Sequence, residues 1–500
     1  MRFKNKGEVY MLLVSLVPII FVLIGMIVLK KSAIVVSPLT LILTVFLAFI
    51  VFKMNSANIV NETIKGVTEG GKIIFLVWSA FAMLVMLQYT KAMERIKITL
   101  ANITDDRRIL LIMIGYCFSI FLEGAAGAGT PTAICAPFLV GVGFTPLSAA
   151  IAGMLGAGIA PSWGGAGATT IVGHSVVAEH IPLQLASAIS GLIAMFGAFL
   201  IPSIMIFALL GKNGFKGLKK YILFISFITS SSFFLITNYI GPEIVSLGSG
   251  AIGIIASLIY VKVFKHETPE EYRYIPEKIN HDENSIPTAV KAFAPYTILI
   301  IALPVIRFSF PLATLSKYGY VVWIACVIFM VVLLGALILN SLKYYPIFIK
   351  ESLLKVIPAF ISMGSLLSVA NIMKQTGMLS IIAQSLSNFA GNGYPIVAVL
   401  IGSLGTFIAG TGLGSNIMFG PMHMSAAELL SLNKVTIFAA QNVGGAIGNM
   451  ICPNNIVAVA ATVDTLGKEG EIMKKCIPSW GILVGVYGLI GVIFTHIIFL

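Results

Sequence analysis

A single carboxylate stands inside a long uncharged stretch of this sequence. Glu123 is the only Asp, Glu, Lys or Arg residue between positions 109 and 170. A carboxylate at membrane depth is costly and often marks an ion or proton pathway, and a buried carboxyl group can hold a proton near neutral pH. The structural alternative is that Glu123 caps free N–H groups of a neighbouring turn. We predict that Glu123 carries a proton, or helps to hold a coupling cation.

Two glycine-rich stretches resemble each other in the order of their residues. The first covers residues 123–137 and the second residues 409–421, and each combines a Gly-x-Gly sequence, a hydroxyl residue and a later proline. Residues 127–130 align with residues 412–415. Because Gly and Pro do not sustain a regular helix through such runs, we predict a re-entrant hairpin at each stretch.

A second interruption follows each hairpin. Residues 156–161 and 448–453 both have the spacing Gly-x4-Pro, so each half offers one hairpin and then one broken helix. Broken helices survive in a membrane only where they are packed in protein or line a watered cavity. Corresponding broken segments in two halves are typical of a transporter's binding site near the bilayer midplane. Close packing through small residues would explain the Gly and Ala residues, but not the prolines and amides at matching places.

These interruptions define a predicted binding site. The N-terminal ends of half-helices present free N–H groups and favour an anion, so we expect a small carboxylate between the two hairpin tips. The predicted binding residues are Gly127, Gly129, Thr130, Thr132, Gly412, Gly414, Ser415, Asn416, Asn449, Asn454 and Asn455. Lys374 is predicted either as a cationic partner of the substrate or as a residue that snorkels to the surface.

The composition indicates the element class that must position these residues. Of 500 residues, 58% are hydrophobic and only 10% are Asp, Glu, Lys or Arg, whereas soluble domains carry about 25% charged residues. The net charge of +12 is concentrated in short gaps between apolar runs, which is the positive-inside pattern of a membrane protein and not a nucleic-acid footprint. We predict an all-α polytopic membrane protein with roughly 12 to 14 transmembrane helices.

One hydrophilic segment divides the apolar runs. Residues 265–291 are rich in charged side chains, so we predict an N-terminal transmembrane half at 1–264, a solvated loop at 265–291 and a C-terminal half at 292–500. The two halves are expected to be related as inverted repeats. The lysines of residues 212–220 place that side of the membrane in the cytoplasm.

The sequence carries no signature of an enzyme. It contains no His-Glu-x-x-His, no Walker loop and no Gly-x-Ser-x-Gly. Five cysteines without a Cys-x-x-Cys spacing give no metal site. We predict no catalytic residue, no cofactor and no metal.

The interrupted zones resemble the lactate permease family of bacterial proton symporters. Residues 123–131 read Glu-Gly-Ala-Ala-Gly-Ala-Gly-Thr-Pro, which is similar to the family's Glu-Gly-Ala-Ala-Gly-Phe-Gly-Thr-Pro. Residues 415–420 resemble its Ser-Ser-Asn-x-Leu-Phe-Gly motif, and residues 444–453 resemble its Gly-Gly-x-x-Gly-Lys-Met-Ile-Ser-Pro motif. The likeness covers most of the chain in layout.

This chain departs from the family's pattern at three places. Asn449 stands where the family has Lys, Cys452 where it has Ser, and Gly412 where it has Asp. The inferred site therefore lacks one cation and one anion, whereas the family's Glu is retained at Glu123.

The resemblance implies uptake of lactate, glycolate or a similar 2-hydroxy monocarboxylate, with protons, by alternating access in the bacterial cytoplasmic membrane. A sodium-coupled carrier of another organic anion, such as a dicarboxylate, is the alternative, and an anion channel is a further one. The expected partners are the organic acid, a proton or sodium ion, and membrane lipid, with no nucleic acid. Homo-oligomerisation stays open.

Overall fold

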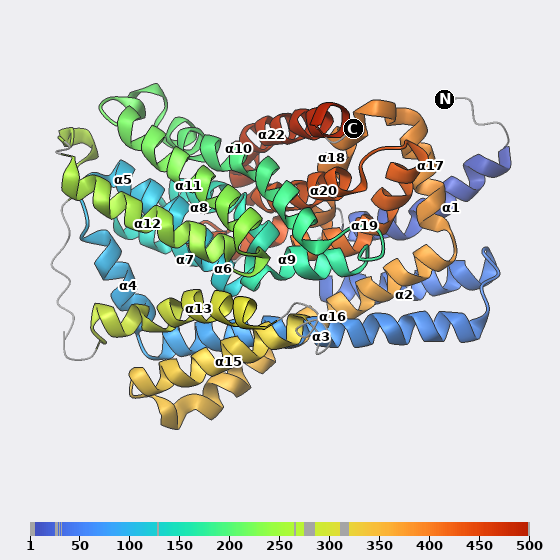
Figure 1. The fold of residues 1–500 in the computed structure, drawn as a ribbon, viewed down its shortest axis with the longest axis horizontal. Helices are drawn as coiled ribbons and strands as arrows, with labels where there is room; N and C mark the ends of the chain where they lie inside the picture. The colour runs from blue at the N-terminus through green and yellow to red at the C-terminus, as the bar shows by residue number, and fades with distance from the viewer. Residues whose placement is uncertain are drawn as a thin grey trace.

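The computed structural model describes residues 6–25, 29, 31, 33–127, 130–264, 267–274, 286–310 and 320–498. Within these ranges the chain forms helices and no strand (Figure 1). The all-α prediction is confirmed.

The described residues of the first half form helices α1 to α12 and several short helical segments. They are α1 (Lys6–Leu23), α2 (Ala33–Ile50), α3 (Ser56–Tyr89), α4 (Ala92–Ala101), α5 (Arg107–Ile112), η2 (Met113–Phe118), α6 (Ser119–Ala126), α7 (Thr130–Gly141), α8 (Pro146–Gly156), η3 (Ala160–Trp163), α9 (Gly164–Ser175), α10 (Leu183–Leu210), η4 (Lys212–Phe215), α11 (Lys219–Tyr239), η5 (Pro242–Ile244) and α12 (Val245–Val263).

The second half continues in the same manner. Its elements are α13 (Ala289–Ser309), α15 (Tyr320–Ile338), α16 (Tyr345–Gln375), α17 (Met378–Ala390), α18 (Tyr394–Ala409), α19 (Gly412–Leu429), α20 (Lys434–Gly448), η10 (Asn449–Ile451), α21 (Pro453–Thr462) and α22 (Glu469–Ile493).

Many of these helices suit a bilayer. Eight helices in the described part of the chain are long and apolar enough to cross a membrane, and nine if the bent pair α8 and η3–α9 counts as one span. Four shorter apolar helices of 10–17 residues accompany them. The protein is therefore a multi-pass membrane protein.

The span that carries Glu123 lies at the centre of the bundle. Its apolar stretch, Arg107–Ala125, is 100% buried, compared with 39% for Glu469–His496. A π-helical segment, η2, interrupts it at Met113–Phe118, and such interruptions are frequent at functional sites. A Cβ on Gly156 would lie within van der Waals overlap of the carbonyl oxygen of Gly115, so α8 and this span touch backbone to backbone.

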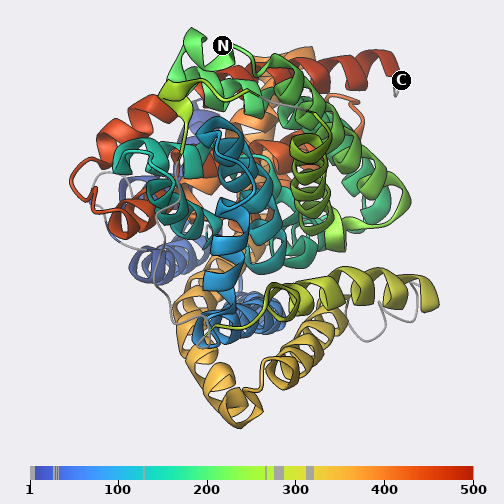
Figure 2. The same ribbon diagram turned by 90° about the vertical axis from the view of Figure 1, so that its left-hand side faces the viewer.

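A second layer lies beside the main bundle. The long helices α3 and α16 pack along each other, α15 packs on α3, and α13 packs on α15 and α4. Figure 2 shows the yellow-green and amber helices α13 and α15 below the main bundle. A Cβ on Gly70 would lie 2.9 Å from the Cα of Gly364, so small residues let α3 and α16 approach closely.

A buried ion pair fixes the loop that follows α10. Asp106 accepts a hydrogen bond from the backbone N–H of Arg108, which caps α5, and its carboxylate lies 2.7 Å from the Arg108 guanidinium. Arg108 also donates to the carbonyl oxygens of Gly214 and Lys216. Because both charges are fully buried, removal of one would leave the other without compensation. The loop is thereby held against the start of the central span.

The hydrophilic segment folds partly onto the same region. Asp105 accepts hydrogen bonds from the Thr268 hydroxyl and the Tyr274 backbone N–H. Residues 275–285 of the predicted loop lie outside the described ranges.

Candidate functional site

The first predicted hairpin is present at the end of α6. The helix stops at Ala126, Gly127 has φ 66° and ψ −167°, and α7 begins at Thr130. Gly129 and the side chain of Thr130 lie outside the described part of the structure. A Cβ on Gly127 would lie 2.9 Å from the backbone nitrogen of Gly165, so this tip contacts the start of α9.

Glu123 lies on the last turn before this tip. Its side chain is buried, with 3% exposed. A Cβ on Gly164 would lie 2.6 Å from Glu123 Oε1, so the carboxylate sits directly against the backbone at the start of α9. A side chain at position 164 would force the Glu123 carboxylate to shift.

The segment that receives Glu123 and Gly127 has an unusual backbone. Gly165, Ala166 and Gly167 are all left-handed, with φ of 55°, 54° and 80°. Three such residues in succession cannot continue a right-handed α-helix. Ala166, the one residue among them that is not glycine, has a strained conformation of the kind that clusters at functional sites. The α8–α9 pair bends by 54° at its break, which confirms the predicted first broken helix.

The backbone of a second acidic residue, Glu243, lies against the same segment. A Cβ on Gly167 would lie 2.4 Å from the carbonyl oxygen of Pro242 and 3.1 Å from the Cα of Glu243. Glu243 is 3% exposed. Our sequence interpretation missed it, because a Glu in a short turn between two apolar runs resembles an interfacial residue. Its position after a Gly-Pro pair, between two spans, was the available signal.

The second predicted hairpin is also present. The helix α18 ends at Ala409, Gly410 is left-handed with φ 77°, and α19 begins at Gly412. The Thr411 side chain accepts a hydrogen bond from the backbone N–H of Gly414 at 3.1 Å. The tip is thus an N-capped helix start.

The two tips contact one common segment. Gly127 lies against Gly165, and a Cβ on Gly412 would lie 3.3 Å from the Thr169 methyl group. These two contact points are four residues apart on α9, and Figure 1 places α6, α9 and α19 together in the middle of the molecule. The α9 segment therefore lies between the two tips.

Asn416 connects the second tip to α9 and α20. Its amide nitrogen donates to the Thr169 carbonyl oxygen at 3.2 Å and to Asn442 Oδ1 at 2.8 Å. Asn442 in turn donates to the Thr170 hydroxyl at 2.8 Å and to the Ser190 hydroxyl at 3.1 Å. These side chains are buried, so each lost bond would leave a polar group without a partner.

The chain of hydrogen bonds continues to α18. Gln441 donates to the Ser415 hydroxyl at 2.9 Å, and its Oε1 lies 2.8 Å from His423 Nε2. Since a carbonyl oxygen only accepts, Nε2 carries the proton, and the neutral ring accepts from the Tyr394 hydroxyl at Nδ1, 2.9 Å away. Our sequence interpretation missed Gln441 and Asn442; adjacent amides in the apolar sequence of residues 437–448 were the signal.

One buried hydroxyl at the second tip has no hydrogen-bond partner. Thr406 is 0% exposed, and its Oγ1 makes no hydrogen bond with any residue that the structure describes. A Cβ on Gly445 would lie 3.3 Å from this oxygen. A buried hydroxyl without a partner costs free energy unless a ligand or water meets it.

The second broken helix is interrupted more mildly than the first. A short 3-10 segment, η10, joins α20 to α21. Residues Lys434–Ala460 are nevertheless long and apolar enough to cross a membrane as one span. Asn455 donates to Asn449 Oδ1 at 2.7 Å, and both are buried. Asn454 is exposed, and a Cβ on Gly410 would lie 2.8 Å from its amide nitrogen.

The remaining predicted residues divide between the centre and the surface. Thr132 is buried with 2% exposed, and α7, on which it lies, packs against α21. Lys374 is 48% exposed and bonds Glu179 at 3.0 Å. This hydrogen bond and the Lys374 charge lower the pKa of the Glu179 carboxyl. The structure thus brings most predicted residues to the two tips and puts Lys374 in a surface ion pair.

The packing of the two halves is reciprocal. In the first half, α9 follows the broken helix and packs against α19, which follows the second tip. In the second half, α21 follows the broken helix and packs against α7, which follows the first tip. Each broken helix therefore contacts the hairpin of the other half, as expected for repeated halves around one site.

Comparison with known proteins agrees with this arrangement. The L-lactate permease family model matches residues 11–348 and 308–498. The chain is 25% identical to the glycolate permease GlcA of Escherichia coli K12, over 97% of this chain and 96% of that protein. It is 28% identical to a putative L-lactate permease of Haemophilus influenzae, over 88% of this chain and 89% of that protein.

A solved structure is similar in fold to this chain. It comes from the work titled "Structure and Function of Neisseria gonorrhoeae MtrF Illuminates a Class of Antimetabolite Efflux Pumps", with a TM-score of 0.50 and 13% identity. The match covers 88% of this chain and 84% of that chain. At this identity the likeness concerns the fold alone.

The relatives are named permeases, so the prediction of a transporter and not an enzyme is confirmed. The family model spans nearly the whole chain. The chain belongs to the L-lactate permease family.

Proposed function

We propose that this protein carries a small 2-hydroxy monocarboxylate, of the lactate or glycolate type, across the bacterial cytoplasmic membrane together with protons. The relatives named L-lactate permease and glycolate permease support this substrate class. The observation that carries the proposal is the meeting of both hairpin tips on one buried segment, with the Glu123 carboxyl group against it.

In this proposal the substrate carboxylate binds at the second tip. The first N–H groups of α19 point out of the helix start, and the half-helix gives that end a positive partial charge. The Thr406 hydroxyl, which is buried and has no partner, donates to the substrate. Gly412 and Gly414 place no side chain over this backbone, and the exposed Asn454 beside Gly410 contacts the substrate.

Ser415 and Asn416 mainly hold the start of α19 in place and do not themselves bind the substrate. The Ser415 hydroxyl donates to the carbonyl oxygen of Gly402 at 2.7 Å and accepts from Gln441, and the Asn416 amide is bonded to Thr169 and Asn442. These bonds hold the helix start toward the site and orient its N–H groups. Asn449 and Asn455 do the same for the start of α21, and Gly127, Gly129, Thr130 and Thr132 form the facing tip.

Glu123 carries the coupling proton. The carboxyl group is buried against a left-handed backbone segment that is packed between the two tips. Movement of either tip changes the solvation of this carboxyl, and therefore its proton affinity, since burial disfavours the charged form. In alternating access the proton and the substrate are exposed together, first to one side of the membrane and then to the other.

Glu243 favours one alternative for the coupling ion. Its backbone lies against the same segment as Glu123, and carboxylate oxygens suit a hard cation such as sodium as well as a proton. In that alternative a sodium gradient drives transport of the organic anion.

The test is uptake into proteoliposomes of labelled L-lactate, glycolate and a C4-dicarboxylate, under an imposed proton or sodium gradient. We expect saturable accumulation of the monocarboxylates, driven by an inward proton gradient and abolished by a protonophore. Accumulation that depends on sodium alone would support the alternative. An ohmic current carried by the anion without accumulation would contradict a carrier mechanism.

A further inference from the structure

A groove between α10 and α22 lies outside the site described above. It has a volume of about 480 Å³, and its lining comes from the end of α10, from η4 and from the start of α22. None of the tip residues is among its ten lining residues. A hydrophilic organic acid is therefore not expected to use it.

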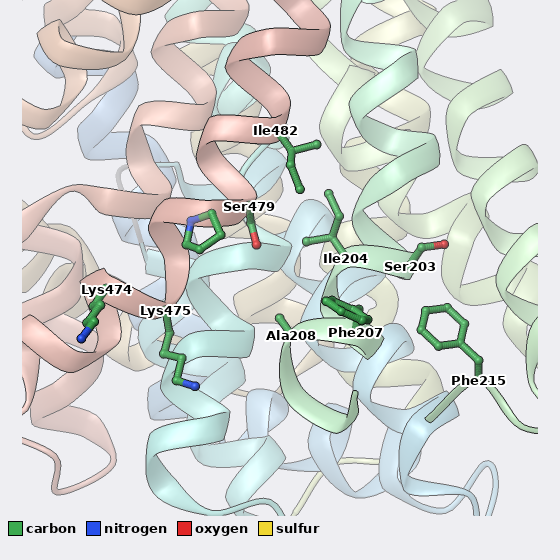
Figure 3. A pocket seen from close by; sticks show the side chains of 10 residues that line it. Ser203, Ile204, Phe207, Ala208, Phe215, Lys474, Lys475, Ser479 and Ile482 are labelled. Atoms are coloured by element: carbon green, nitrogen blue, oxygen red, sulfur yellow. The ribbon is translucent and has the colours of Figure 1, made fainter. Parts of the chain in front are cut away.

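The walls of this α10–α22 groove are apolar. Ile204 and Phe207 face Ile482 across it, and Figure 3 shows these side chains between the two ribbons. Phe207 and Ile482 are 58% and 51% exposed, and both helices are candidate membrane spans. The exposed walls therefore belong to the protein's hydrocarbon-facing perimeter, where an acyl chain is the natural contact.

One end of the groove is cationic. Lys474 and Lys475 line it at the start of α22, and Figure 3 shows both on the side away from Ile482. No Asp or Glu is among the lining residues, although Glu471 lies one turn before Lys475 on the same helix. Lys212 and Lys216 flank Phe215, another lining residue, in the neighbouring loop.

Apolar walls with lysines at one end favour an amphiphilic ligand that has an anionic headgroup. Two lysines at the end of an apolar groove match the phosphate and the acyl chain of an acidic phospholipid. The lysines also lie on the side that the positive-inside rule places in the cytoplasm, where anionic headgroups attract basic residues. The Asp106–Arg108 pair holds the loop that carries Phe215, so this side of the groove is fixed before any lipid binds.

We propose that the α10–α22 groove binds one acidic phospholipid of the membrane. The phosphate lies between Lys474 and Lys475, and one acyl chain packs on Ile204, Phe207 and Ile482. The lipid thereby bridges α10 to α22. Because Ser190 on α10 accepts a hydrogen bond from Asn442, the bound lipid supports the helix that holds one end of the central hydrogen-bond network.

The test uses the full-length protein in nanodiscs and measures the association of spin-labelled phosphatidylglycerol and phosphatidylcholine. We expect wild type to prefer phosphatidylglycerol by on the order of tenfold. The double variant Lys474→Gln, Lys475→Gln should reduce this preference to about twofold or less. The matched control Lys219→Gln, Lys220→Gln removes two lysines outside the lining set from the same side, and should keep most of the preference.

A second variant tests the apolar part of the groove. Ile482→Trp fills the space between the helices, and should release the labelled chain while the near-by lysines remain. Inorganic phosphate should not compete with the lipid at millimolar concentration. Equal loss in both lysine variants, full retention in Ile482→Trp, or efficient competition by inorganic phosphate would each overturn the proposed lipid site.

Discussion

The two interrupted zones present polar groups at membrane depth by different chemical means. In the first zone the backbone is distorted, with three consecutive left-handed residues and a 54° bend, and a carboxyl group, Glu123, lies against it. In the second zone residues Lys434–Ala460 form one span with a short 3-10 segment, and side-chain amides supply the polar groups.

The difference indicates a division of labour. A buried carboxyl group beside a distorted backbone responds to a change of charge, because burial disfavours its charged form. The amides and hydroxyls of Ser415, Asn416, Gln441 and Asn442 do not titrate near neutral pH, and their shared hydrogen bonds fix the geometry of the second tip. We therefore expect the first zone to govern coupling and the second zone to govern the position of the substrate.

The sharpest way to break this comparison is to neutralise Glu123. Glu123→Gln should lower proton-driven accumulation by roughly 100-fold or more, because the proton carrier is lost, while substrate exchange is partly retained. The measurement is uphill uptake and counterflow in proteoliposomes. Glu428→Gln, at an exposed carboxylate paired with Lys434, is the control. Unchanged uphill uptake in Glu123→Gln would remove the coupling role.

A substitution of Gly167 tests the distorted backbone. Gly167→Ala adds a Cβ that would lie 2.4 Å from the Pro242 carbonyl oxygen, at a φ of 80°. We expect a loss of roughly 2 kcal/mol or more in stability, from the clash and the strain together. Gly217→Ala is the matched control, since Gly217 has φ 73° but open space around it. Thermal unfolding of both variants in detergent compares them, and an equal loss would show that the contact is unimportant.

The amide network is tested at Asn442. Asn442→Ala removes its bonds to Asn416, Thr170 and Ser190. Hydrogen bonds between membrane helices contribute about 0.6 kcal/mol each on average, so we expect a loss of about 1–2 kcal/mol in stability and a raised KM. The pH dependence of uptake should keep its shape. A shifted pH profile would contradict the proposed division between the zones.

The smallest effect is expected at the surface ion pair. Lys374→Gln should change KM by about twofold or less, because exposed pairs contribute little. The Glu179 pKa is lowered by Lys374, so the pair is present above the ordinary carboxyl pKa and is lost as the pH falls through the lowered value. KM measured at pH 7 and at acid pH checks both points, and Lys434→Gln is the control. A large rise in KM would instead support Lys374 as the counter-charge of the substrate.

Local sequence determined where the chain breaks. Gly127, Gly410 and Gly167 have positive φ angles that favour glycine. Pro161 and Pro453 each lie in the first turn of the helical segment that follows a break. The family motifs around Glu123 and at residues 444–453 could also be recognised from the sequence alone, because each lies within one short segment. These features depend on neighbours in the chain, so composition and spacing suffice to predict them.

Only the tertiary structure decided which of these groups meet. Asn416 bonds Thr169, 247 residues away, and Glu243 approaches the left-handed segment from a turn that the sequence interpretation did not single out. Lys374 pairs with Glu179 on the surface. Such partnerships are set by how the helices pack, and no spacing in the sequence records them, because side chains far apart in the chain meet only when backbones approach through small residues such as Gly127, Gly164 and Gly412.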